Sequence, residues 1–575
     1  MRRILTLLLL AAACADARAQ RLDPDNYIYP ILQESRLCSA NFGELRPGHF
    51  HAGVDIKTDG VEGKPLVAVA DGYVSRLSVA AGGYGRAIYL TLRNGTTAVY
   101  GHLQRFRDDI EEHVRKERLA RRSNSVNLWF EPGVWPVKQG DVIGYSGNSG
   151  SSGGPHLHFE IRDTPTQRLH NLVREGVIRP EDNLPPRIMR VHYVEIDTLD
   201  GVPVRSTPES YAVVRESEGH YRLTRSEPVE VGRKGYFIAE VTDRRNGVYN
   251  TFGVWRVTAS IDGRPYFEYR MDGFTHDLSR CCDAVSCYPL QIASRNEAIR
   301  LAQLAGSPDT FYPVMEERGL VRTEAGEKRL LRIEAEDDSG NRSSLEFPIA
   351  GRAESFRAVP DPTATALFPG ENTVVGVGPE ARIRIQPGSL YEPLFVRPER
   401  LDMPQGSPGV VVLSPAYRFL EATTPLREPA LVTIRAQVPR QLRLRTVLAG
   451  RSRKGGLYHV GGTYSNGAVT AVTRTTGDLV VVADTLAPTI RPLFTEGEDL
   501  TKTATLRFHV GDNFSGITTW TLRIDGEWVP CDRFPMKGTL VHTFDTPATR
   551  RRHTAELTVR DGCGNTARYT GTFVR

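Results

Sequence analysis

Residues 154–161, Gly-Pro-His-Leu-His-Phe-Glu-Ile, constrain this chain more than any other stretch, because they hold two histidines two residues apart. Polar and apolar side chains alternate along the segment, which predicts a β-strand. Successive side chains of a strand point to opposite faces, so His156 and His158 are expected on one face. Two imidazoles on one face are the start of a metal site, which needs further ligands from elsewhere in the chain.

Candidate partners for these histidines lie upstream. Residues 51–55 are His-Ala-Gly-Val-Asp, and residues 100–103 are Tyr-Gly-His-Leu. The second segment ends a predicted hairpin, in which strand-like runs at 86–92 and 96–100 flank an Asn-Gly turn. Hydrolytic zinc sites use three protein ligands and leave the fourth position to water. His and Asp are suitable residue types for such a site.

These segments together resemble the lysostaphin/LytM-type zinc endopeptidases, which cut peptidoglycan peptides. The resemblance covers roughly residues 42–163, where 51–55 fit the H-x-x-x-D motif of that family and 156–158 fit its H-x-H motif. Glycine-containing segments at 140–144 and 146–150 match as well. The resemblance implies five site residues: the zinc ligands His51, Asp55 and His158, and the catalytic histidines His102 and His156.

The implied function is a zinc-dependent endopeptidase that hydrolyses peptide cross-links of bacterial peptidoglycan by a metal-activated water. The same family contains members that lost their ligands, so a catalytically silent scaffold or regulator of another cell-wall hydrolase is the alternative. The long C-terminal portion favours this alternative, whereas the five filled positions favour an enzyme. A peptidase that acts on proteins instead of the cell wall is a third hypothesis.

Other histidines are given no catalytic role. His49 precedes His51 by two residues, but the spacing of the family motif selects His51. His49 is therefore expected to be a cleft or structural residue. His113 and His170 are expected on the surface.

The N-terminus predicts export. Arg2 and Arg3 precede a run of leucines and alanines, and residues 17–19, Ala-Arg-Ala, supply the small residues that a signal peptidase reads. We therefore expect a signal peptide at 1–19 and an exported protein, periplasmic or secreted. The residue three before Cys14 is alanine instead of leucine, which disfavours lipoprotein anchoring. No later apolar run is long enough to form a transmembrane segment.

Length and charge limit the domain count and the partners. A chain of 575 residues exceeds what one hydrophobic core serves, so we expect about three or four domains. The formal net charge of +5 is small for this length and predicts no nucleic-acid partner. The expected partners are peptidoglycan peptides, with envelope proteins as candidates for the C-terminal β-sandwiches.

An internal repeat organises the C-terminal portion. Three pairs of segments match: 182–188 with 484–490, 241–263 with 510–526, and 338–341 with 561–565. Both copies contain short strands separated by Asp/Gly/Asn turns, which is typical of immunoglobulin-like β-sandwiches. Turn formation is the simplest explanation of these aspartates, and calcium binding is the alternative.

The expected fold is mainly β: a compact β-sheet zinc peptidase domain with a helical insertion, followed by β-sandwich domains. Asp108 to about Arg122 is predicted to be helical because acids fill its first turn and bases its last. This helix is expected as a lid or wall beside the cleft, or as a solvated surface helix. The expected segments are a signal peptide (1–19), the peptidase domain (20–184), an immunoglobulin-like sandwich with an insertion (185–352), a sandwich of unknown type (353–483) and a second immunoglobulin-like sandwich (484–575).

The insertion in the first repeat copy contains a predicted helix at 295–304 and a cluster of three of the six cysteines that follow the signal peptide. An oxidising compartment permits disulfides. Cys531 with Cys563 is the preferred pair, because both fall in the last predicted domain. Two of the three clustered cysteines are further candidates for a bridge.

Overall fold

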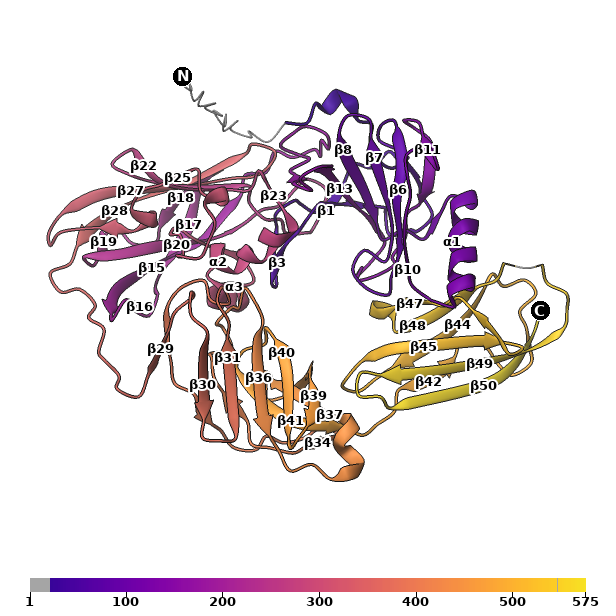
Figure 1. Cartoon of the computed structure of the whole chain (residues 1–575). Helices are drawn as coiled ribbons and strands as arrows, with labels where there is room; N and C mark the ends of the chain where they lie inside the picture. The colour runs from indigo at the N-terminus through magenta and orange to yellow at the C-terminus, as the bar shows by residue number, and fades with distance from the viewer. Residues whose placement is uncertain (1–20, 546) are drawn as a thin grey trace, which may run out of the picture.

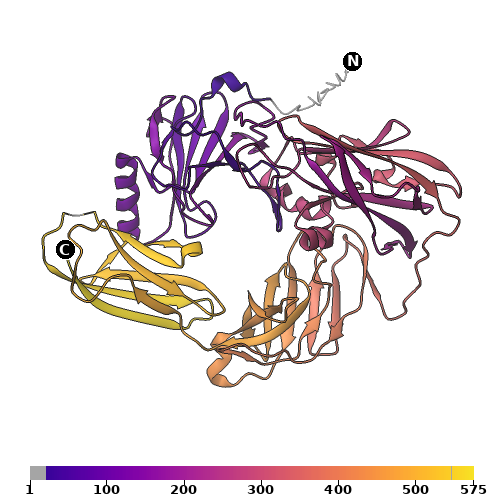
Figure 2. The same ribbon diagram turned by 180° about the vertical axis from the view of Figure 1, so that it is seen from behind.

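The computed structural model describes residues 21–545 and 547–575, so the predicted signal peptide and Cys14 lie outside the described residues. The described chain is mainly β, as expected. Four sheet-rich parts follow one another around a ring, and the C-terminal strands return to helix α1 (Asp108–Arg121) of the first part (Figures 1 and 2). No helix within the described ranges is long and apolar enough to cross a membrane.

The first part is built on a sheet whose main path runs β1-β4-β13-β8-β7-β6-β10. A smaller sheet, β5-β12-β9, shares its core. The predicted hairpin is present as β7 and β8, and Gly95 takes a φ of 85° in its turn. The strands are β1 (Cys38–Ala40), β4 (Val54–Lys57), β5 (Pro65–Val67), β6 (Gly72–Val79), β7 (Arg86–Leu92), β8 (Thr96–Gly101), β9 (Arg105–Phe106), β10 (Val126–Trp129), β12 (Val142–Tyr145) and β13 (His156–Asp163).

The position of β13 between β4 and β8 brings distant segments of the chain together. Its apolar side chains, Leu157, Phe159 and Ile161, are buried in the core of the first part. The strand therefore presents its histidines on the opposite face. In the antiparallel register, His158 lies opposite Asp55 of β4 and opposite Gly101 of β8.

Helix α1 has the predicted bounds within one residue, but it is neither only a lid nor only a solvated helix. Ile110 and Val114 are buried in the core of the first part. On the helix, the guanidinium of Arg118 donates to Asp532 of the C-terminal part at 2.6 Å. Arg86 of β7 donates to the same carboxylate at 2.9 Å. The helix is thus a bridge between the two ends of the chain.

Asp532→Asn is expected to detach the C-terminal part from α1 and to lower the free energy of unfolding by about 3 kcal/mol, since the buried Arg118 loses its counter-ion. Chemical denaturation and small-angle scattering would measure the two effects. Asp545→Asn is the matched control, because Asp545 pairs with Arg115 at the surface and such pairs contribute about 0–1 kcal/mol. Equal effects of the two substitutions would contradict the assignment.

The second part contains β15 (Arg187–Leu199), β20 (Lys234–Thr242), β21 (Arg256–Ile261), β27 (Lys328–Glu336) and β28 (Arg342–Gly351) in one 13-stranded sheet system. Its core also takes in the hairpin β2 (Leu45–Arg46) and β3 (His49–Phe50) from the first part. The Phe50 ring lies 5.4 Å from the ring of Phe274. The two parts share this core, so it does not mark a boundary between them. The domain boundaries proposed from the sequence therefore stay predictions.

The predicted helix at 295–304 is wrong. The helix in this region, α3, runs Tyr288–Ser294, and Arg295 ends it with a φ of 64°. Residues 297–300 instead form strand β24 (Glu297–Arg300), which pairs with β20 and buries Ile299. Packing against an open sheet edge has overridden the local helical pattern.

The fourth part consists of two sheets around one core, and the third consists of two larger sheets together with the small pair β29 (Thr365–Leu367) and β32 (Leu394–Val396). In the third, β36 (Ala430–Arg435) and β41 (Asp478–Asp484) belong to opposite sheets and contribute Val432 and Val481 to a common cluster. In the fourth, one sheet contains β44 (Thr505–Gly511). The opposite sheet contains β45 (Ile517–Ile524), β49 (Arg552–Asp561) and β50 (Thr566–Val574). Both parts are β-sandwiches, as predicted.

The expected disulfide between Cys531 and Cys563 is wrong, because both thiols are free. Cys531 lies inside the core of the fourth part, whereas Cys563 packs against Val447 and Val482 of the third part. The clustered cysteines of the second part are free as well. Proximity in the sequence placed these residues in one domain but did not predict which core each one enters.

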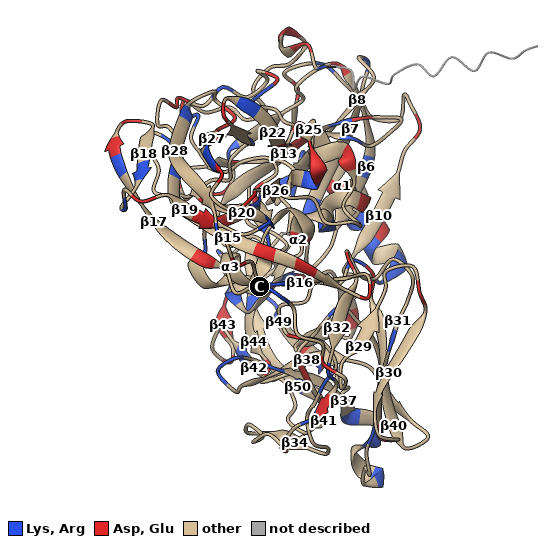
Figure 3. Cartoon of the chain, turned by 90° about the vertical axis from the view of Figure 1, so that its left-hand side faces the viewer, with Lys and Arg blue, Asp and Glu red and all other residues tan. Residues whose placement is uncertain are grey.

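Charged residues are distributed over the molecule without segregation by sign. Blue segments (Lys and Arg) and red segments (Asp and Glu) are interspersed along the ribbon in Figure 3. This distribution agrees with the small net charge of +5.

Candidate metal centre

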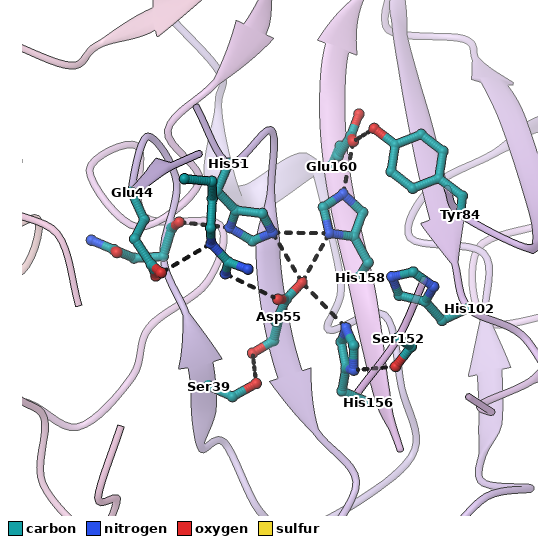
Figure 4. A network of polar contacts seen from close by, with 12 residues as sticks. Ser39, Glu44, His51, Asp55, Tyr84, His102, Ser152, His156, His158 and Glu160 are labelled. Atoms are coloured by element: carbon teal, nitrogen blue, oxygen red, sulfur yellow. Dashed lines mark hydrogen bonds and ion pairs between the residues drawn. The ribbon is translucent and has the colours of Figure 1, made fainter. Parts of the chain in front are cut away.

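Two histidines and a carboxylate converge beside β4 and β13, on the face opposite the apolar core (Figure 4). Asp55 Oδ1 lies 3.1 Å from His51 Nε2 and 2.8 Å from His158 Nδ1, and these two nitrogens are 3.2 Å apart. All three residues are buried, with exposed fractions of 7% for His51, 8% for Asp55 and 4% for His158. The structure thus brings together the three residues that the sequence predicted as metal ligands.

Hydrogen bonds to residues outside this group fix the tautomers of His51 and His158. Nδ1 of His51 donates to the carbonyl oxygen of Asn41 at 2.8 Å, which leaves a lone pair on Nε2. Nε2 of His158 donates to Glu160 Oε1 at 2.8 Å, which leaves a lone pair on Nδ1. Both lone pairs therefore face the carboxylate of Asp55, an arrangement that requires a positive charge between them.

A zinc ion fits this donor set. Zinc takes imidazole nitrogens and carboxylate oxygens at ~2.0–2.2 Å in tetrahedral geometry, so its ligand atoms lie about 3.3 Å from one another. The separations here, 2.8–3.2 Å, are close to that value. Three protein donors leave one coordination position for water or substrate, as in catalytic zinc sites.

Ionisation of the site shows the same need for positive charge. Burial lowers the pKa of His158, but hydrogen bonds to Asp55 and Glu160 outweigh it and raise the pKa to about 9. Burial raises the pKa of Asp55, but its interactions with the neighbouring imidazoles, first His51 and then His158, hold it well below its usual range. The three residues thus favour a positive charge between them, which a bound metal ion would supply.

Glu160 is a functional residue that the sequence analysis quoted in a motif without giving it a role. Its carboxylate accepts hydrogen bonds from His158, from Arg162 Nε at 2.7 Å and from the hydroxyl of Tyr84. Burial raises the pKa of Glu160, and Arg162 and His158 lower it to about 2. The charged carboxylate orients the His158 ring and makes it more basic. Its position two residues after His158, on the same strand face, was the available signal.

Glu160→Gln is expected to weaken zinc binding by about 10–100-fold, because the neutral amide orients His158 without adding basicity. Competition with a chelator of known affinity would measure this change. Glu175→Gln is the matched control, since Glu175 also accepts from a buried histidine, His170, away from the centre. Unchanged zinc affinity in Glu160→Gln would contradict the orienting role.

His102 and His156 lie beside the three converging residues, with ring centroids 4.7 Å apart. His102 Nδ1 donates to Ser149 O, and His156 Nδ1 donates to Gly154 O, both at 2.8 Å. Each ring therefore keeps Nε2 for proton transfer, and Nε2 of His156 lies 3.5 Å from Asp55 Oδ1. Burial, followed by the charges on His156 and His158, lowers the pKa of His102 to about 3, so its ring is neutral near pH 7.

Backbone conformation also contributes to this geometry. His102 has a φ of 62°, an uncommon value for a residue with a side chain, and its backbone amide donates to Tyr84 O at 2.8 Å. Gly53, between His51 and Asp55, approaches β13 closely: a β-carbon there would lie 2.4 Å from the carbonyl oxygen of Phe159. Only glycine permits this approach.

His49, His113 and His170 do not belong to the centre. His49 is exposed on β3, and its Nδ1 contacts Pro47 O. His113 is half-buried, with its ring 5.6 Å from that of Phe130. The expected surface position of His170 is wrong, because this residue is buried and bonded to Asp163 and Glu175.

Comparison with known proteins identifies the first part. Residues 49–125 and 135–170 match peptidase family M23, so the first part of the chain contains an M23 peptidase domain. The gap between the two matched segments includes Trp129. Residues 365–484 match the Zu5-like domain, which covers most of the third part.

Two curated relatives match the peptidase region. An uncharacterized metalloprotease of Haemophilus influenzae is 33% identical over 143 residues, which are 23% of this chain and 24% of the relative. The DD-carboxypeptidase/endopeptidase Mpg of Neisseria meningitidis is 32% identical over 118 residues, 20% of this chain and 21% of the relative. The chain thus spans less than a quarter of the length of these relatives.

Among solved structures, the catalytic domain of the prophage-encoded M23 protein EnpA from Enterococcus faecalis matches at 26% identity. The match covers 23% of this chain and 85% of that domain, with a TM-score of 0.18.

Proposed function

We propose that this protein is an exported zinc-dependent endopeptidase that hydrolyses peptide cross-links of bacterial peptidoglycan. The observation that carries the proposal is the convergence of lone pairs from His51, Asp55 and His158, with His102 and His156 beside them. The name of the Neisseria meningitidis relative, a DD-carboxypeptidase/endopeptidase, supports this substrate class. The predicted signal peptide supports work outside the cytoplasm.

His51, Asp55 and His158 would hold the zinc. Bound zinc supplies a Lewis acid that polarises the scissile carbonyl and increases the acidity of water. Asn41 and Glu160 fix the two imidazoles so that their lone pairs stay directed inward. The site is therefore organised before substrate arrives, which lowers the cost of reaching the transition state.

His102 and His156 supply proton transfer. Because each Nδ1 is bound to a backbone carbonyl, Nε2 of each ring can accept a proton from water or donate one to the departing amine. A protonated Nε2 can also donate a hydrogen bond to the oxyanion that develops on the substrate carbonyl. Two adjacent imidazoles thus provide both an acid and a base.

A catalytically silent scaffold is less well supported. Such a protein needs neither the inward lone pairs nor the two additional histidines, yet all five positions are filled here. We propose that the C-terminal β-sandwiches position the enzyme in the envelope.

Digestion of purified sacculi tests the function. The mature chain, from residue 20 onward, would be treated with a chelator, reloaded with one equivalent of zinc and incubated with sacculi, and the soluble products analysed by mass. Muropeptides with hydrolysed cross-links are expected from the zinc-loaded protein alone. Absence of products with zinc bound would reject the peptidoglycan substrate, and a protein that binds no zinc would support the scaffold.

A further inference from the structure

Two groups of three aspartates, one in each repeat copy, occupy equivalent positions. The carboxylate oxygens lie within 4.8 Å of one another in both groups: Asp182, Asp243 and Asp337 in the second part, and Asp484, Asp512 and Asp561 in the fourth. In each group the first aspartate precedes the sandwich, and the second directly follows a core strand, β20 or β44. The third lies at the end of the first strand of the last hairpin: Asp337 follows β27, and Asp561 is the last residue of β49. We refer to these groups as the first and second triads.

The structure corrects the alignment of the two copies at the last hairpin. Asp337, and not Asp338, is the equivalent of Asp561. Asn341 donates to Asp337 Oδ2 at 2.9 Å and to the carbonyl of Asp182 at 3.4 Å. Asn565 makes the same pair of contacts, to Asp561 Oδ2 at 2.7 Å and to the carbonyl of Asp484 at 3.2 Å. The two triads therefore share one architecture.

Turn formation explains only part of this arrangement. Asp337 Oδ1 accepts from the amides of Gly340 and Asn341, and Asp512 Oδ2 accepts from the amide of Gly516. Asp243 does not stabilise a turn in this way: the residue is 0% exposed, and neither of its carboxylate oxygens has a hydrogen-bond partner. Oδ1 of Asp512 is unpaired in the second triad as well. A buried carboxylate without partners is costly unless a cation binds it.

The charge balance of the first triad points the same way. Asp338 is adjacent to the triad and binds Arg245, whose Nε also lies 3.8 Å from Asp182 Oδ2. The Arg245 guanidinium thus lies near two of the four carboxylates gathered here, Asp338 and Asp182. Burial, and then the charges of Asp337, Asp182 and Asp338, raise the pKa of Asp243 to about 9 in the ion-free protein.

We propose that each triad binds one calcium ion, so that the chain carries two structural calcium sites separate from the zinc centre. A point equidistant from three atoms 4.8 Å apart lies about 2.8 Å from each, near the ~2.3–2.6 Å at which calcium binds carboxylate oxygen. The donors are all oxygens, a set that selects a hard cation over zinc. Water or backbone oxygen completes the coordination of such sites.

Each site lies at a junction between consecutive parts of the chain. At the first, Asn41 of the peptidase part donates to Asp338 Oδ2 at 3.4 Å, and Asp182 lies on the connection into β15. At the second, Asp484 ends β41 of the third part, and Asn513 donates to Pro408 O at 3.2 Å. Calcium would therefore hold adjoining parts of the ring at fixed angles.

Calcium binding to the mature full-length chain tests the proposal. After chelation and reloading with zinc, equilibrium dialysis against calcium is expected to give two bound ions per chain. Asp243→Asn and Asp512→Asn are each expected to bind one ion, and the double variant none. His49→Ala, an exposed residue of the first part, is the control and is expected to bind two.

Thermal unfolding would measure whether the variants are folded. Asparagine has nearly the shape of aspartate and removes a buried carboxylate without partners, so Asp243→Asn is expected to unfold at or above the wild-type temperature without calcium. Calcium is expected to raise the unfolding temperature of the wild type more than that of either variant. Wild-type protein that binds fewer than two ions at millimolar calcium, or variants that still bind two, would overturn the proposal.

Discussion

Replacement of His158 by alanine is expected to remove zinc from the protein and to lower the rate of peptidoglycan hydrolysis by at least about 10³-fold. Loss of Nδ1 leaves two protein donors, His51 and Asp55, which is fewer than catalytic zinc sites use. Metal catalysis contributes several kcal/mol, and about 4 kcal/mol corresponds to this 10³-fold change. Elemental analysis of the dialysed protein and release of muropeptides would measure the two effects.

Two further variants make this result specific. His158→Gln keeps most of the side-chain volume, so a loss of zinc there cannot be attributed to a cavity. His49→Ala removes an exposed imidazole from the same part of the chain and is expected to keep full zinc content and activity. Retention of stoichiometric zinc and normal hydrolysis in His158→Ala would exclude the proposed centre.

Replacement of His156 by alanine is expected to preserve zinc content and lower the rate of hydrolysis by about 10²–10⁴-fold, the usual contribution of a general acid or base. His102→Ala is expected to behave in the same way. Neither ring belongs to the group of His51, Asp55 and His158 whose donor atoms lie within 4.8 Å of one another, so neither loss is expected to open the metal site. Measuring zinc content and hydrolysis rate on the same preparations separates this outcome from that of His158→Ala.

The double variant adds a test of cooperation. The rings of His102 and His156 are in contact, so we expect the two residues to act as a unit. In that case the double variant loses no more activity than the more severe of the two single variants. Multiplication of the two single losses would show that the histidines act independently. Loss of zinc from His156→Ala would contradict its assignment and make it a ligand.

The sequence determined those features that depend on neighbours along the chain. Alternation predicted β13, the Asn-Gly pair predicted the turn between β7 and β8, and the charged ends of α1 predicted its bounds. Local signals failed where long-range packing decided the outcome. Residues 297–300 became a strand beside β20, and Cys531 and Cys563 entered different cores.

The family resemblance carried by two short motifs, H-x-x-x-D and H-x-H, implied which residues would form the centre. Only the tertiary structure decided that β4 pairs with β13 in the register that sets Asp55 opposite His158. It alone revealed Glu160 as the partner of His158, and the contact of Asp532 with Arg118 across 414 residues. The aspartates of the repeats gave a turn signal in the sequence, and folding left Asp243 buried without a partner. Strand register and burial arise from contacts between distant segments, and a linear pattern does not encode them.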